Sequence, residues 1–217
     1  MRMLVDLSHT IEHGMITYAG LPPPAISDFL TREDSRSHYA AGTEFHIGRI
    51  DMVANTGTYL DTPWHRFGDG SDVSMIPLDA VAGVPALVVR ANGRSMEAAA
   101  VAGLDLHGKA LLIHTGWSRH WRTETYCNNQ HPFVTREAAE KLARSGVRVV
   151  GIDSYNIDDT SDSTRPAHTT LLGAGIYIVE HLTNLESLPD LGPIRFFAVP
   201  PKVRGLGTFP VRAFAMV

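Results

Sequence analysis

The stretch TREAAEKLARSGVRVVGID, residues 135–153, carries the clearest secondary-structure signals in the chain. Thr135 can cap the N-terminus of a helix, and Gly146 can end it. The apolar run at residues 147–152 follows at once and predicts a buried strand. A helix that leads directly into a strand favours an α/β fold with some parallel pairing. The helix has an apolar stripe formed by Ala138, Ala139, Leu142 and Ala143.

Outward from this stretch, short runs rich in Val and Ile predict further buried strands. With 217 residues, 44% of them hydrophobic, the chain can form one domain with a full core. We therefore predict a single α/β domain over residues 1–217, with a central mixed β-sheet flanked by helices. The additional strands are expected at residues 86–89, 111–113, 176–179, 194–199 and 211–217.

The charge pattern narrows the range of partners. The net charge is −4, and no run of Lys or Arg is present, so binding to nucleic acid or to an anionic membrane is not expected. No apolar stretch is long enough to span a bilayer, and the N-terminus lacks the apolar core of a signal peptide. The one cysteine, Cys127, is compatible with a reducing compartment. We expect a cytoplasmic protein that acts on a small molecule.

The densest group of reactive side chains lies in NTGTYLDTPWHRFGDG, residues 55–70. Asp61 and His65 are four positions apart, and Pro63 between them argues against a helix that continues through this stretch. An extended or turning backbone would let both side chains converge on one pocket. In the alternative interpretation, Asp61 caps a turn and His65 is a surface histidine, because this spacing is common by chance.

A second group lies in RPAHTTLLGAGIYIVEHLTNLESLP, residues 165–189. Glu180 ends an apolar, strand-like run, where a carboxylate either faces solvent or serves a site. His181 is its neighbour, and adjacent strand residues point to opposite faces, so His181 should not face the site if Glu180 does. His168 is the third candidate of this group. The chain has no G-x-S-x-G elbow, no Walker A loop and no G-x-G-x-x-G fingerprint.

Together these segments resemble the cyclase family, which includes bacterial kynurenine formamidases and isatin hydrolases. The family signature is H-x-G-T-H-x-D-x-P-x-H, and the same frame here reads NTGTYLDTPWH, residues 55–65. The resemblance continues in DLSHTIEHGMITYAGLPPP near the N-terminus, in TGW, GID and HTTLL, and in VEHLTNLESLP and KVRGLGTFPVRAFA.

The resemblance implies a mixed-sheet α/β fold, assembly into homodimers or homotetramers, and hydrolysis of an amide-type C–N bond at a divalent metal. It places Asp61, His168 and Glu180 at metal-ligand positions and His65 at the proton-transfer position. Asn55 and Tyr59 occupy the two remaining ligand positions, where the family has histidine.

The two replacements change what the site can bind. An Asn amide oxygen is a poor ligand for zinc, and a phenol must lose a proton with a pKa near 10 to bind metal well. We therefore expect at most one divalent ion, zinc or manganese, at Asp61, His168 and Glu180. In the alternative, no metal binds, and Asn55 and Tyr59 supply hydrogen bonds instead.

Three functions follow from these options. In the first, a metal-dependent hydrolase uses His65 as general acid and base with Asp61, and Tyr59 or Asn55 stabilises the oxyanion. In the second, a metal-independent enzyme performs cyclisation, dehydration or isomerisation on the same scaffold. In the third, the chain only binds a small molecule.

Aromatic residues indicate the kind of substrate. Tyr18, Trp64, Phe67 and Trp117 are expected to line the pocket, although core packing explains Trp117 equally well. Such a lining would favour a flat cyclic or aryl compound. Tyr18 lies in the segment 14–24, which is rich in Pro and Gly and should form an irregular wall of the site.

Overall fold

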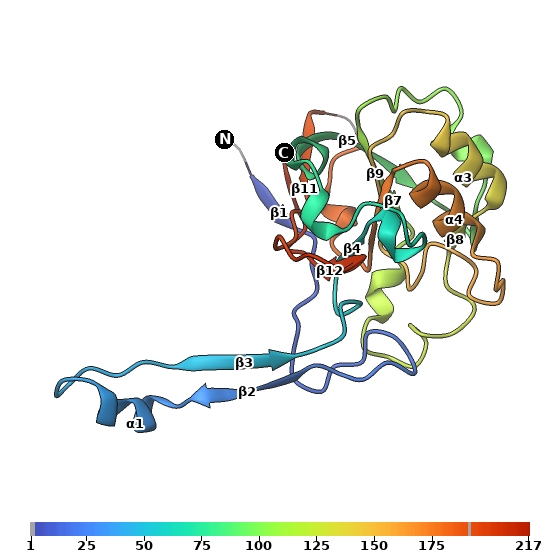
Figure 1. The fold of residues 1–217 in the computed structure, drawn as a ribbon. Helices are drawn as coiled ribbons and strands as arrows, with labels where there is room; N and C mark the ends of the chain where they lie inside the picture. The colour runs from blue at the N-terminus through green and yellow to red at the C-terminus, as the bar shows by residue number, and fades with distance from the viewer. Residues whose placement is uncertain (1–2, 191) are drawn as a thin grey trace.

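The computed structural model describes residues 3–190 and 192–217 and contains a nine-stranded mixed sheet in the order β1-β13-β11-β5-β7-β9-β10-β4-β12 (Figure 1). The strands of this sheet are β1 (Leu4–Asp6), β4 (Tyr59–Asp61), β5 (Ala82–Arg90), β7 (Ala110–His114), β9 (Val149–Ile152), β10 (Tyr177–Glu180), β11 (Ile194–Phe197), β12 (Thr208–Pro210) and β13 (Phe214–Met216). The other elements are β2 (Ala25–Leu30), β3 (Ile47–Asp51), β6 (Ser95–Met96), β8 (Phe133–Val134), α1 (Arg32–Ser35), α2 (Leu78–Val81), α3 (Arg136–Ala143) and α4 (Pro166–Gly173).

The middle of the sheet is parallel. Strands β5, β7, β9 and β10 pair in parallel, whereas β4 joins β10 antiparallel. Helix α3 lies in the connection from β7 to β9, and α4 lies in the connection from β9 to β10. Parallel neighbours need such crossovers because a short turn cannot return the chain to the same end of the sheet.

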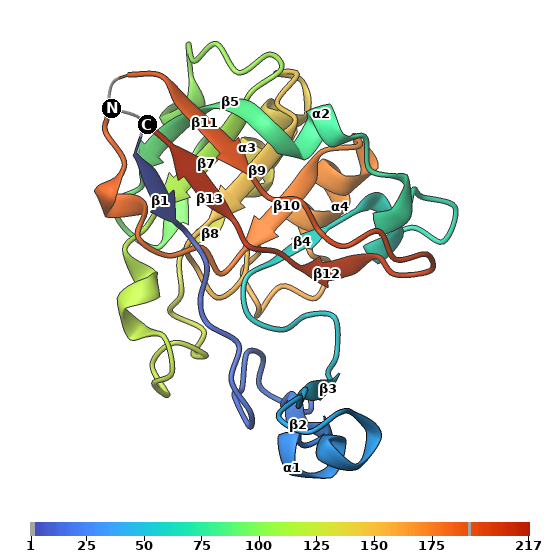
Figure 2. The same ribbon diagram turned by 90° about the vertical axis from the view of Figure 1, so that its left-hand side faces the viewer.

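Two apolar cores lie on opposite faces of the sheet. On one face, α3 and α4 pack over side chains such as Leu111, Val150 and Ile178. On the other face, residues from both ends of the sheet join one core, because the sheet curls on itself (Figure 2). The prediction of an α/β domain with a mixed sheet is therefore confirmed, with the two longer helices gathered on one face.

The predicted elements around α3 are confirmed closely. The Thr135 hydroxyl accepts a hydrogen bond from the Ala138 amide, and Gly146 takes the left-handed conformation with φ 75°. The run predicted at 147–152 forms a shorter strand, β9, which begins at Val149. The run at 211–217 likewise forms a strand only at Phe214–Met216.

An arm formed by residues 25–51 extends away from the body of the protein (Figure 1). Its strands β2 and β3 pair antiparallel and are exposed along both faces, and α1 lies near its tip. No pattern in residues 25–51 predicted this arm. Among the described residues, no helix has both the length and the apolar character needed to cross a membrane.

Two close backbone contacts fix the turn that follows β4. This turn is the 3-10 helix Pro63–His65. Just before it, the Thr62 amide donates a hydrogen bond of 2.8 Å to the carbonyl of Gly207, the residue that precedes β12. A Cβ atom added to Gly207 would lie 2.5 Å from the His65 backbone, and one added to Gly70 would lie 2.6 Å from the Pro63 carbonyl carbon. Only glycine permits this approach, so both glycines determine where His65 lies.

We predict that Gly207→Ala destabilises the protein by about 1–3 kcal/mol, because the new methyl group must push apart two segments of backbone. The matched control is Gly68→Ala in the turn after β4, where a Cβ would meet nothing within 4 Å and the backbone is not left-handed. That variant should change the free energy of unfolding by less than about 0.5 kcal/mol. Chemical denaturation measures both, and equal stability of the two variants would contradict the role given to Gly207.

Candidate functional site

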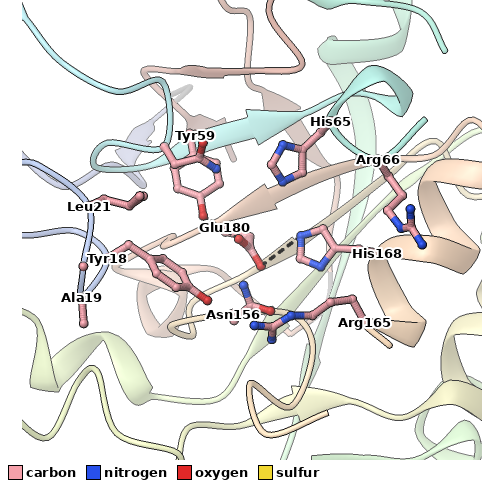
Figure 3. Close-up of a pocket in the computed structure, with 12 residues that line it drawn as sticks. Tyr18, Ala19, Leu21, Tyr59, His65, Arg66, Asn156, Arg165, His168 and Glu180 are labelled. Carbon is pink, nitrogen blue, oxygen red and sulfur yellow. Dashed lines mark hydrogen bonds and ion pairs between the residues drawn. The ribbon is translucent and has the colours of Figure 1, made fainter. Parts of the chain in front are cut away.

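A cavity of about 490 Å³ opens beside the neighbouring strands β10 and β4. Tyr59 comes from β4, Glu180 from β10 and His168 from α4, and His65 comes from the turn after β4. Figure 3 shows His65, His168 and Glu180 turned toward one space. The cavity is lined by Tyr18, Ala19, Gly20, Leu21, Asn55, Tyr59, His65, Arg66, Asn156, Arg165, His168 and Glu180.

The Asp158 carboxylate fixes both the start of α4 and the ring of His168. It accepts hydrogen bonds from the backbone amides of Ala167 at 2.5 Å and His168 at 3.1 Å. It also contacts His168 Nδ1 at 2.6 Å. A carboxylate can only accept here, so Nδ1 carries a proton and Nε2 faces the cavity. Metal-binding histidines are typically oriented by such a carboxylate.

A second relay orients His65. The Thr208 hydroxyl donates its single proton to Asp61 Oδ1 at 2.6 Å and lies 3.0 Å from His65 Nδ1. The hydroxyl must then accept from Nδ1–H, so Nε2 is the ring nitrogen left for other contacts. His65 Nε2 is 3.9 Å from Asp61 Oδ1. Both imidazoles therefore turn Nε2 toward the same carboxylate.

Asp61 is the centre of this arrangement. Its Oδ2 atom is buried without a hydrogen-bond partner among the described residues, and it lies 3.7 Å from His168 Nε2. Asp61, His65 and His168 each offer one ligand atom, and these atoms lie within 4.8 Å of one another. Glu180 Oε1 is 3.8 Å from His168 Nε2 but falls outside that set. An unpartnered carboxylate oxygen that faces a free imidazole nitrogen fits one divalent ion.

The charges of the site also favour a cation at His168. Burial opposes the charged ring, but Glu180, Asp158 and Asp61 together raise the pKa of His168 to about 10. Burial raises the pKa of Glu180 to about 7, with a further contribution from Asp61. The pKa of Asp61 is lowered, because His168, His65 and Thr208 outweigh the effect of its burial. A positive charge at Nε2 of His168, carried by a proton or by a metal ion, would offset the negative charge of these carboxylates.

The two replaced positions, Asn55 and Tyr59, do not fit a second ion. The Tyr59 hydroxyl donates a 2.7 Å hydrogen bond to Glu180 Oε2. Burial and the Glu180 charge raise the pKa of Tyr59 well above its ordinary value, so the phenol stays protonated. Asn55 lines the cavity with a neutral amide. Neither side chain therefore adds a good ligand to the atoms of Asp61, His65 and His168.

His181 lies outside the cavity lining, as expected, but it follows the end of β10 with a left-handed backbone, so strand alternation is not the reason. Its Nε2 is 3.3 Å from the Tyr59 hydroxyl, and its Nδ1 is 2.8 Å from the Tyr126 hydroxyl. Because Tyr59 donates to Glu180, its oxygen accepts from Nε2–H, and Tyr126 then donates to Nδ1. This buried chain of hydrogen bonds holds Tyr59 against Glu180.

Several residues lie elsewhere than the sequence analysis expected. Trp64 and Phe67 are not among the cavity-lining residues: Trp64 packs over Gly205, and Phe67 packs against Gly173 of α4. The Trp117 indole donates to the Tyr126 carbonyl and is likewise outside the lining. The aromatic wall consists instead of Tyr18 and Tyr59.

Other site residues were missed by the sequence analysis. Asp158 and Thr208 orient the two histidines, and Arg66, Asn156 and Arg165 line the cavity. Thr208 lies in the segment KVRGLGTFPVRAFA, which carries part of the family resemblance, but nothing in its local pattern singles it out.

Comparisons with known proteins agree with this architecture. The sequence profile of the Cyclase family, described as "Putative cyclase", matches residues 5–159. A kynurenine formamidase of Geobacillus thermodenitrificans is 30% identical over 211 residues, 96% of this chain and 95% of that protein.

Solved structures are similar over the whole chain. A potential metal-dependent hydrolase with cyclase activity superposes with a TM-score of 0.81 at 28% identity, covering 100% of this chain and 98% of that one. Isatin hydrolase A from Ralstonia solanacearum has a TM-score of 0.82 at 25% identity, covering 100% and 92%.

The buried His181 predicts a pH dependence of stability. Burial, with a smaller effect of His9, lowers the pKa of His181 from 6.5 to about 3. Between these values the unfolded chain binds a proton that the folded chain does not, so stability is lost as the pH falls below 6.5. The loss from this residue between pH 7 and pH 5 is about 2 kcal/mol.

The comparison variant is His181→Asn, since asparagine tolerates the left-handed backbone of this position, φ 56°. From pH 7 to pH 5, the unfolding free energy of His181→Asn should fall by less than that of the wild type, and the difference should be about 2 kcal/mol. Urea titrations at the two pH values measure the difference. Parallel pH profiles would show that His181 is not held neutral.

Proposed function

The chain belongs to the cyclase family, and on this premise we propose that it hydrolyses an amide-type C–N bond of a small aryl or cyclic substrate at one divalent metal ion. The observation that carries the proposal is the buried, unpartnered Oδ2 of Asp61 opposite the free Nε2 of His168. The names of its relatives, kynurenine formamidase and isatin hydrolase, support this class of substrate.

Asp61, His168 and Glu180 would hold the ion, zinc or manganese. These three side chains are all buried, with exposed fractions of 0%, 7% and 1%. When bound, the ion would polarise the substrate carbonyl and lower the pKa of a coordinated water toward about 7. His65 is far more accessible, with 36% of its side chain exposed, and this suits a group that exchanges protons with a substrate.

In this proposal His65 moves the proton. Its Nε2 lone pair takes the proton of the water that attacks the carbonyl carbon, and it then gives a proton to the leaving nitrogen. The Thr208 hydroxyl keeps the ring oriented through Nδ1–H, and Asp61 stabilises the transient positive charge. Asp61 therefore serves both the proposed metal and the base.

Asn55 is the better oxyanion donor of the two replaced positions. The Tyr59 hydroxyl is already committed to Glu180. Asn55 lines the cavity, and its side chain forms no hydrogen bond with the rest of the described chain. A side-chain amide that faces a developing oxyanion can supply the hydrogen bond that stabilises it.

The alternative is metal-independent chemistry, such as cyclisation, dehydration or isomerisation. The raised pKa of His168, about 10, supports it, because an imidazolium could balance the buried carboxylates without any metal. His65 and Glu180 would then perform acid–base catalysis alone. The metal content of the active protein separates this alternative from the hydrolase.

We further propose that the arm pairs with a second copy of the chain. Its two strands expose apolar side chains, among them Ile26 at 41%, Phe29 at 72% and Ile50 at 49%. An isolated two-stranded hairpin is at best marginally stable in water, and exposed apolar patches mark contact surfaces. A cytoplasmic homo-oligomer that acts on a small molecule remains our expectation, and the lone Cys127 suits that compartment.

For the catalytic proposal, we predict that His65→Ala lowers turnover by about 10²-fold or more, because the general acid and base is lost. N-formylkynurenine and isatin are the first substrates to test, and His107→Ala, an exposed histidine outside the cavity, is the control. Elemental analysis should find at most one ion per chain in the wild type and the same content in His65→Ala.

Other results of these measurements would assign different roles to His65, Glu180 and the metal ion. Loss of the ion in His65→Ala would make His65 a ligand, as its place beside Asp61 and His168 permits, and would leave Glu180 as the base. Two stoichiometric ions in the wild type would refute the single-metal site. Full activity with no ion would establish the metal-independent alternative.

For the arm, we predict that the double variant Ile26→Lys, Ile50→Glu converts the oligomer to a monomer. The two residues are cross-strand partners, so the new charges can pair and the hairpin should keep its structure. Leu78→Glu, on the body and 68% exposed, is the control. Light scattering coupled to gel filtration measures the mass, and a monomeric wild type would rule out the pairing.

A further inference from the structure

Two arginine side chains line the cavity on either side of His168. Arg66 directly follows His65, and Arg165 directly precedes helix α4. Among residues 3–190 and 192–217, no carboxylate oxygen lies within 4.0 Å of either guanidinium. Both positive charges therefore lie at the cavity without an ion-pair partner in the described chain.

The contacts that these arginines do make leave most of their donors free. Arg66 Nε donates to the Thr169 hydroxyl at 3.2 Å, and its guanidinium lies over the Phe67 ring, 5.4 Å from the centroid. Arg165 makes one long contact, 3.4 Å, to the Asp159 carbonyl. A guanidinium has five N–H donors, so most of them are available to a ligand.

The backbone of Arg165 is unusual for a residue with a side chain. Its φ of 48° and ψ of 61° are left-handed, although it precedes Pro166, where an extended backbone is the norm. Such conformations persist where the surrounding structure needs them, often at functional sites. In Figure 3 the Arg165 side chain extends below His168 toward Asn156.

We propose that Arg165 binds a carboxylate of the substrate and that Arg66 adds positive charge on the other flank of His168. The substrate class is then an aryl amide or cyclic amide that carries a carboxylate, an inference that rests on the proposed hydrolase function. A guanidinium matches a carboxylate with two parallel hydrogen bonds. A cavity of about 490 Å³ accommodates a compound of one or two rings.

The charge distribution would also orient this substrate. Glu180 and Asp61 repel a carboxylate from the deep side of the cavity, whereas the arginines attract it to the side of His168. The aromatic ring then lies toward Tyr18, whose ring stacks on Tyr155 at 4.4 Å between centroids. In this orientation the bond to be hydrolysed lies near His65, between the substrate carboxylate at the arginines and the substrate ring at Tyr18.

A binding experiment tests the proposal without requiring turnover. The probes are 2-aminobenzoate and 2-aminobenzamide, which differ in the carboxylate alone, titrated calorimetrically into the purified protein. The wild type should bind the acid at least about tenfold more tightly than the amide, as one charge-assisted contact predicts. Arg165→Gly should lose most of that preference, and glycine suits the left-handed backbone, so the variant should fold.

The control is Arg144→Ala, which removes an exposed positive charge after α3 and should keep the preference. Equal binding of acid and amide by the wild type, or an undiminished preference in Arg165→Gly, would overturn the proposal. So would a preference that persists in Arg165→Gly and disappears after dialysis against a chelator, since the carboxylate would then bind a metal. A preference that depends on Arg165 in a protein that hydrolyses no amide would retain this proposal and refute the hydrolase.

Discussion

The carboxylate of Asp158 is the constraint on which the candidate site depends. It caps helix α4 by accepting from two backbone amides, and the same group fixes the ring of His168. The position of the helix and the direction of the imidazole are therefore determined by one buried charge. Asp61 and Glu180 can approach His168 only because that ring presents Nε2 to them. Loss of this single carboxylate would disturb the crossover from β9 to β10 and the reactive face of the site together.

The fold was predictable where the signals were local. The helix α3 has its cap, its stop and its apolar stripe within twelve residues, and the parallel strands are continuous apolar runs. The arm was not predictable, because β2 and β3 are exposed on both faces and have no buried side to impose an alternating pattern. Helix α4 was missed because its cap, Asp158, lies eight residues before its first residue, outside any local capping motif.

The candidate site shows the same division. The sequence analysis proposed His65, Asp61, His168, Glu180 and Tyr18, partly from local patterns and partly from the family resemblance, and these residues lie around one site. Thr208 acts on Asp61 across 147 positions of the chain, and no local pattern reports such a contact. The arginines were missed because lone basic residues beside a histidine are common on surfaces. Only the fold shows that Arg66 and Arg165 line the same cavity, where neither has an ion-pair partner among the described residues.

The edges of the sheet are closed by pairs of strands that are distant in sequence. β1 pairs with β13, and β4 pairs with β12, so the segment from Gly207 to Met216 completes both. During synthesis on a ribosome, β4 and the turn that carries His65 emerge long before this segment. The edge beyond β4 therefore stays unpaired in a nascent chain until residues 207–216 have emerged, and contacts of this separation slow folding. His65 gains the Thr208 contact that orients its ring only when this segment has joined the sheet, so the reactive geometry of the site forms later than the turn that carries His65.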